Sequence, residues 1–160
     1  LKAGDLRGYD VVVNAFGAAP GQEHQHVEVG RALIGALQGN DDTRLIVVGG
    51  AGSLFVDEAK TVRLLDTPEF PKAYYATASN QGQNLLDLQS STGVNWTFVS
   101  PSAFFDPSGP RTGAYRTGND HLLTNSQGKS YISYADLAVA VLDEIERPRH
   151  VGQRFTVVSE

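Results

Sequence analysis

Three short apolar runs, separated by segments with helical periodicity, constrain the fold of this chain more than any other feature. The runs span residues 10–16, 44–49 and 95–100, and each reaches a glycine or proline at its end. Short apolar runs of this kind are typical of parallel strands buried between two layers of helices. Parallel neighbours need a crossover connection, so we expect helices between the runs.

The segments between the runs have the spacing that this arrangement requires. Residues 22–38 carry a row of apolar side chains on one helical face: Val29, Leu33, Ala36 and Leu37. Residues 72–92 do the same with Ala78, Leu85 and Leu88, and Gly93 ends that helix. A third helix follows Ser133, whose spacing to Asp136 resembles a capping box. We expect its inward residues to be Leu137, Val141, Leu142 and Ile145, and a last strand at residues 154–158.

This order of elements predicts an α/β fold with a doubly wound parallel sheet. With 160 residues and 41% hydrophobic content, the chain is long enough for one core, so we expect a single domain over residues 1–160. The first strand should lie at an edge of the sheet. Residues 101–130 are rich in loops, and we expect a small hairpin around Gly118 and Asn119.

Composition excludes several classes of protein. A net charge of −5 argues against nucleic-acid and anionic-membrane partners. The absence of cysteine excludes a disulfide framework, a thiolate zinc site and a cysteine nucleophile. No apolar run approaches the roughly 20 residues of a membrane span. We therefore expect a cytoplasmic protein whose partner is a small molecule; the oligomeric state stays open.

The isolated charged residues do not indicate a metal site. His24 and His26 are two residues apart, so on a helix they point in different directions, and His24 pairs better with Glu28. His121 and His150 need no role. We expect the last helix to present one solvated acidic face: Asp143, Glu144 and Glu146.

The ends of the three strands predict a binding site. In open parallel sheets, ligands bind beyond the carboxyl ends of the strands, and here those ends are small or flexible: residues 14–17, 49–52 and 101–104. Glycines at such ends let the backbone approach a flat ligand closely. The run from Gly50 to Gly52 is not a dinucleotide fingerprint, because Phe55 stands where the third glycine would be.

Six segments together carry a resemblance to a known family: residues 8–15, 48–54, 95–105, 109–113 with Tyr115, 130–138 and 153–157. The chain resembles the NADH-flavin reductases, within the NmrA-like, NAD(P)H-binding atypical short-chain dehydrogenases/reductases. The resemblance implies a Rossmann-like fold and NADPH or NADH as cofactor. It also implies a first strand with a phosphate loop and a second strand upstream of Leu1, and the sequence contains no methionine.

The resemblance implies two groups of site residues. We expect the cofactor to contact Asn14, Ala15, Phe16, Gly17, Gly49, Gly50, Ala51, Pro101, Ser102, Ala103 and Phe104. We expect the acceptor pocket to include Ser53, Tyr74, Phe105 and Tyr115, although ordinary packing is an alternative role for these aromatic residues. No catalytic residue is identified.

The chemistry implied by the resemblance depends on a missing motif. Typical short-chain dehydrogenases use Tyr-x-x-x-Lys as the acid, whereas Ala78 and Ser79 follow Tyr74 and Tyr75 by four residues. That favours direct hydride transfer to a flavin or quinone-like acceptor, with FMN or FAD as a candidate substrate. The alternative is an NmrA-like redox-sensing regulator that binds dinucleotide without turnover. A relative of nucleotide-sugar epimerases fits less well, since those enzymes need the missing acid.

Overall fold

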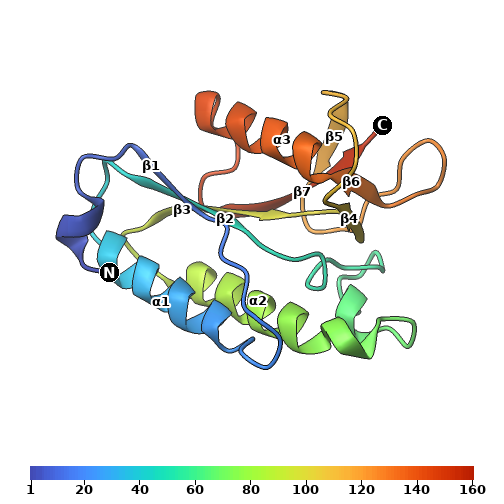
Figure 1. Cartoon of the computed structure of the whole chain (residues 1–160), viewed down its shortest axis with the longest axis horizontal. Helices are drawn as coiled ribbons and strands as arrows, with labels where there is room; N and C mark the ends of the chain where they lie inside the picture. Colours follow the sequence, from blue (N-terminus) through green and yellow to red (C-terminus); the bar gives the residue numbers. More distant parts are fainter.

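The computed structural model describes all 160 residues and is built around a five-stranded sheet (Figure 1). The strands are β1 (Val11–Asn14), β2 (Arg44–Val48), β3 (Asn95–Ser100), β5 (Tyr115–Gly118) and β7 (Gln153–Ser159). Their order across the sheet is β1-β2-β3-β7-β5. The first four are parallel and β5 runs antiparallel to β7, which confirms the predicted, mainly parallel α/β sheet. β1 lies at one edge and pairs only with β2.

Three helices cover the sheet on both faces. Helices α1 (Gln25–Leu37) and α2 (Lys72–Ser90) lie on one face, and α3 (Tyr134–Glu146) lies on the other (Figure 1). There are also two short 3-10 helices: η1 (Ala3–Leu6) precedes β1, and η2 (Leu64–Asp66) precedes α2. None of the α-helices combines the length and the apolar content needed to cross a membrane.

Strands β2 and β3 contribute side chains to two hydrophobic cores, one on each face of the sheet, because successive side chains of a strand point to opposite faces. Leu45, Val47 and Phe98 pack with α1 and α2, whereas Ile46 and Val99 pack with α3. The helices contribute the apolar stripes predicted for them, among them Leu33, Leu37, Leu85, Leu88, Leu137 and Val141. Continuous apolar runs in the strands are therefore a direct result of helices on both faces.

The start of α3 confirms half of the predicted capping box. The Ser133 hydroxyl accepts a hydrogen bond from the backbone N–H of Asp136 at 3.0 Å. The Asp136 carboxylate does not return the contact. It accepts hydrogen bonds from the backbone N–H groups of Thr112 and Gly113 and from the hydroxyl groups of Thr112 and Ser159. Asp136 thereby ties the loop before β5 to α3 and β7.

Three local expectations are wrong. In place of a hairpin at Gly118 and Asn119, β5 pairs with β7, and β4 (Phe104–Asp106) pairs in parallel with β6 (Tyr131–Ser133). Both pairings join distant segments, which local turn residues cannot predict. Leu142 is not inward but 57% exposed. Glu144 is not on a solvated face but only 4% exposed.

The burial of Glu144 also gives His150 a role. The Glu144 carboxylate accepts hydrogen bonds from Arg44 Nη2 (3.1 Å), His150 Nδ1 (2.7 Å) and the backbone N–H of Arg149 (2.9 Å). Burial alone would raise the pKa of Glu144, but these hydrogen bonds outweigh burial and lower it. This ion cluster connects β2, α3 and the loop before β7 at the end of the sheet opposite the predicted ligand site.

Candidate cofactor and acceptor cleft

A cleft of about 1180 Å³ lies beyond the carboxyl ends of β1, β2 and β3. It brings together all but one of the residues expected to contact a cofactor: Ala15, Phe16, Gly17, Gly49, Gly50, Ala51, Pro101, Ser102, Ala103 and Phe104. Parallel strands present their carboxyl ends at one edge, which explains why three separate loops meet there. Contact with a cofactor stays a prediction for each of these residues.

Asn14 is the one residue of that group that does not line the cleft. Its side chain is buried, and its Oδ1 accepts a hydrogen bond from the backbone N–H of Phe16 at 3.1 Å. This contact turns the chain sharply after β1 and presents Phe16 to the cleft. Asn14 therefore shapes the wall without forming it.

His26, at the start of α1, supports the same loop, a role that its sequence position did not reveal. The backbone N–H of Ala18 donates to His26 Nε2 at 3.3 Å, and the Phe16 ring meets the imidazole edge-on at 5.5 Å. Burial lowers the pKa of His26, with Glu23 opposing the effect. An imidazole that accepts through Nε2 must be neutral, so geometry and burial favour the same state.

This arrangement predicts that acid weakens the loop after β1. The unfolded chain takes up a proton on His26 near pH 6.5, before the folded chain does, so the free energy of unfolding should fall as pH drops below about 6.5. His26→Gln keeps an acceptor for Ala18 and should remove that part of the pH dependence. Urea unfolding at pH 7.5 and 5.5 measures it.

His24→Gln is the matched control, because His24 is exposed and pairs only with Glu28 at 3.7 Å. A wild-type and a His26→Gln protein with the same loss of stability on acidification would contradict the role of His26.

Packing within the protein requires Gly49 and Gly52, whereas Gly50 lies against the flexible end of Gln81. A Cβ atom added to Gly49 would lie 1.9 Å from Phe98 Cζ, and one added to Gly50 would lie 2.1 Å from Gln81 Oε1. At Gly52 it would lie 2.6 Å from the Ala78 side chain. Close approach of a ligand to these glycines stays a prediction. They also let the loop lie close to β3 and α2, with its backbone forming part of the cleft wall.

Of the four residues expected in the acceptor pocket, Tyr74 and Phe105 line the cleft. Tyr74 projects from the first turn of α2 and is 65% exposed. Phe105 packs against Tyr134 with ring centroids 4.1 Å apart, and the neighbouring Phe104 stacks on Tyr131 at 5.5 Å. Aromatic side chains therefore stand on two sides of the cleft, on α2 and on the segment after β3.

The structure does not bring Ser53 and Tyr115 to the cleft. The Ser53 hydroxyl is buried and accepts a hydrogen bond from Arg154 Nη1 at 2.9 Å. Tyr115 lies on β5 and donates its hydroxyl proton to Asp143 on α3. Burial and this contact raise the pKa of Tyr115 to about 12. Both residues are held by partners more than 25 positions away in sequence, which their local sequence does not reveal.

Several other lining residues were not identified from the sequence: Thr67, Glu69, Phe70, Thr77, Gln81, Tyr134, Ala138 and Leu142. For those on α2, a signal existed. Thr77 and Gln81 follow Tyr74 by three and seven residues, which places all three on one helical face. Once Tyr74 was assigned to the pocket, helical periodicity could have found the other two.

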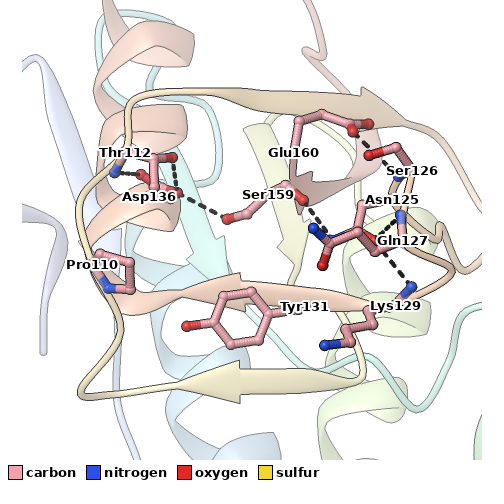
Figure 2. A pocket seen from close by; sticks show the side chains of 10 residues that line it. All are labelled: Pro110, Thr112, Asn125, Ser126, Gln127, Lys129, Tyr131, Asp136, Ser159 and Glu160. Atoms are coloured by element: carbon pink, nitrogen blue, oxygen red, sulfur yellow. Dashed lines mark hydrogen bonds between the residues drawn. The ribbon is translucent and has the colours of Figure 1, made fainter.

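A second, smaller pocket of about 280 Å³ lies among β6, β7 and the loops before them (Figure 2). Four of its residues, Thr112, Asn125, Asp136 and Ser159, form a hydrogen-bonded network. The Asp136 carboxylate is satisfied by its four donors, and Asn125 donates to Ser159 O while accepting from the backbone N–H groups of Gln127 and Lys129 (Figure 2). This network holds the 107–130 loops in place. No group of three or more His, Asp or Glu side chains converges to hold a metal ion.

The fold and the cleft define an NAD(P)-binding type of α/β domain, and comparison with known proteins agrees. Residues 3–148 match the NAD(P)H-binding family, and the chain belongs to that family.

Two relatives illustrate the relationship. The chain is 67% identical to the uncharacterized protein YwnB of Bacillus subtilis, over 100% of this chain and 75% of that protein. It is 42% identical to SP1627 of Streptococcus pneumoniae, described as "a putative NADH-flavin reductase", with a TM-score of 0.96 over 100% of this chain and 76% of that one.

A further crystal structure, of a Burkholderia pseudomallei protein described as a "putative exported protein", is 39% identical with a TM-score of 0.87, over 98% of this chain and 74% of that chain.

The lining of the cleft differs in exposure along its wall. Gly49, Gly50, Ser102 and His26 are buried or half-buried and form the inner wall, whereas the small side chains of Ala15 and Ala103 are exposed. A Cβ atom added to Gly17 would meet nothing within 4 Å, so this part of the wall is open. Apolar walls with few polar groups are typical of sites for flat cofactor rings.

Proposed function

We propose that the protein is an NAD(P)H-dependent reductase that passes hydride to a flavin or quinone-like acceptor. The observation that supports it most is that one cleft combines the small residues at the ends of three parallel strands with the aromatic side chains of Tyr74 and Phe105. Membership of the NAD(P)H-binding family and the name of the SP1627 relative support the same redox chemistry. Within the family we place the chain with the NmrA-like, atypical short-chain dehydrogenases/reductases.

The protein's own contribution is binding and orientation. When bound, the reduced nicotinamide supplies the hydride. The loops after β1, β2 and β3 would hold the nicotinamide, and Tyr74 and Phe105 would hold the acceptor ring, because these residues line the same cleft. Alignment of two reacting rings can supply much of the rate enhancement without an acid. Ala78 occupies the position of the usual lysine, so no ammonium group lies one turn after Tyr74 to assist a proton transfer.

Steady-state oxidation of NADH and of NADPH tests the proposal, with menadione, riboflavin or FMN added as acceptor. We expect oxidation that requires both the protein and an acceptor, and the comparison of the two cofactors identifies the preferred one. Tight binding of NAD(P)H with no oxidation by any acceptor would contradict the proposal and favour a redox-sensing regulator.

Direct hydride transfer predicts a small effect of Tyr74→Phe on turnover. Loss of a general acid typically costs 10²–10⁴-fold, so we expect kcat to fall by well under about 100-fold. Tyr75→Phe is the control, since Tyr75 is exposed on the same turn but does not line the cleft. A drop of about a thousandfold in kcat for Tyr74→Phe, with cofactor binding unchanged, would identify Tyr74 as an acid and favour carbonyl reduction.

A further inference from the structure

We propose that the acceptor is an uncharged planar ring system with carbonyl groups at its edge, a quinone or a flavin without phosphate, and that Gln81 recognises that edge. This inference rests on the proposed function and narrows its substrate class. It depends on two features of the cleft: the charge of its lining and the hydrogen-bonding state of its polar side chains.

The lining contains no lysine and no arginine, and Glu69 is its one carboxylate. Glu69 is exposed and forms no salt bridge with any residue of the chain. The nearby Arg63 already pairs with Asp66 at 3.1 Å. A phosphate on the acceptor would therefore meet a like charge and no cation among the lining residues, whereas an uncharged ring would meet mainly apolar walls.

The N-terminus of α2 does not reverse this preference. Its partial positive charge could attract an anion. However, the charged side chains beside the N-cap Pro71 have opposite signs, Glu69 before it and Lys72 after it, and only Glu69 lines the cleft. An acceptor phosphate would have to compete with that carboxylate.

Gln81 is suited to the polar edge of such a ring. It lies on the same face of α2 as Tyr74, and its Oε1 lies over the backbone of Gly50 at the inner wall. The other polar side chains of the inner wall are engaged: the Ser102 hydroxyl donates to Val157 O at 2.6 Å, and His26 accepts from Ala18.

The Gln81 carboxamide has no hydrogen-bond partner in the protein, and it offers both a donor and an acceptor. The carboxamide NH₂ can donate to a ring carbonyl, and the carboxamide oxygen can accept from a ring N–H group.

The reaction balances without further components. NAD(P)H gives one hydride, which carries two electrons, and solvent gives one proton. A quinone thereby becomes a hydroquinone, and a flavin becomes its dihydro form, while NAD(P)⁺ is left.

Flavin binding tests the charge argument without turnover. Riboflavin and FMN share one ring and differ in the phosphate, so their dissociation constants are compared by fluorescence quenching at low salt, where charges are least screened. We expect riboflavin to bind about tenfold more tightly than FMN, the effect of one unfavourable charge contact near the surface. Glu69→Gln should reduce that ratio. Equal or tighter binding of FMN by the unmodified protein would overturn the inference.

Substitution of Gln81 tests whether its side chain recognises the edge of the ring. Gln81→Leu should weaken the binding of riboflavin and FMN by a similar factor of about ten and leave their ratio unchanged, because the ring and not the phosphate is affected. Gln89→Leu, on the exposed surface of the same helix, is the control. Unchanged binding by Gln81→Leu would remove Gln81 from the site.

The reductase function and the preference for an uncharged acceptor can be contradicted independently of each other. A preference for riboflavin without any oxidation of NAD(P)H would contradict the reductase function and retain the ligand class. Rapid oxidation of NAD(P)H with a preference for FMN would support the reductase function and contradict the uncharged acceptor.

Discussion

Replacing Glu144 by leucine is expected to lower the free energy of unfolding by about 3–5 kcal/mol, the usual cost of leaving a buried charge without its partner. The substitution strands the guanidinium of Arg44 and the imidazole of His150, and it leaves the backbone N–H groups of Arg149 and His150 without an acceptor. Chemical denaturation at neutral pH measures the change.

Glu146→Leu on the same helix is the control, because Glu146 is exposed and we expect a change within about 0.5 kcal/mol. The lowered pKa of Glu144 adds a pH test. Its contribution is fully present above the unfolded-state pKa of about 4.3 and is lost as pH falls through the lower folded-state pKa. Equal effects of the two substitutions would mean that the ion cluster contributes nothing.

The second large effect is expected for Gly49→Ala, which should destabilise the protein by about 3 kcal/mol, the upper part of the range for overpacked cores. The new Cβ would lie 1.9 Å from Cζ of Phe98, whose side chain is completely buried and has no room to move away. Because Gly49 also forms the cleft wall, we expect NAD(P)H binding to weaken as well.

A double-mutant cycle identifies the cause. Phe98→Leu shortens the side chain that the added methyl group would meet, so the two substitutions together should cost less than the sum of their separate effects. Gly35→Ala is the control: Gly35 is exposed in α1 with nothing within 4 Å of an added Cβ, and alanine should stabilise the helix by about 0.5–1 kcal/mol. Additive effects of Gly49→Ala and Phe98→Leu would exclude the proposed clash.

The cleft itself was largely predictable, and the reason is geometric. Residues such as Ala15, Gly50 and Pro101 each follow a recognisable apolar strand. Parallel strands bring their carboxyl ends to the same edge whatever their order, so the residues at those ends meet without any knowledge of tertiary contacts. The polar residues behind this edge were not predictable in the same way. The position of His26 in the sequence gives no sign of its partners, Ala18 and Phe16, because both contacts depend on how the loop after β1 folds back onto α1.

By itself, the sequence determined the features that depend on local periodicity: the three α-helices with most of their apolar faces, the parallel strands β1, β2, β3 and β7, and the start of α3 at Ser133. Only the tertiary structure decided which polar side chains serve the cleft. Ser53 hydrogen-bonds to Arg154, and Tyr115 hydrogen-bonds to Asp143. The buried Glu144 accepts from Arg44, a residue 100 positions away. Periodicity predicts the helix or strand to which a residue belongs. Whether a polar side chain is buried or lines the cleft depends on which distant partner the fold places beside it.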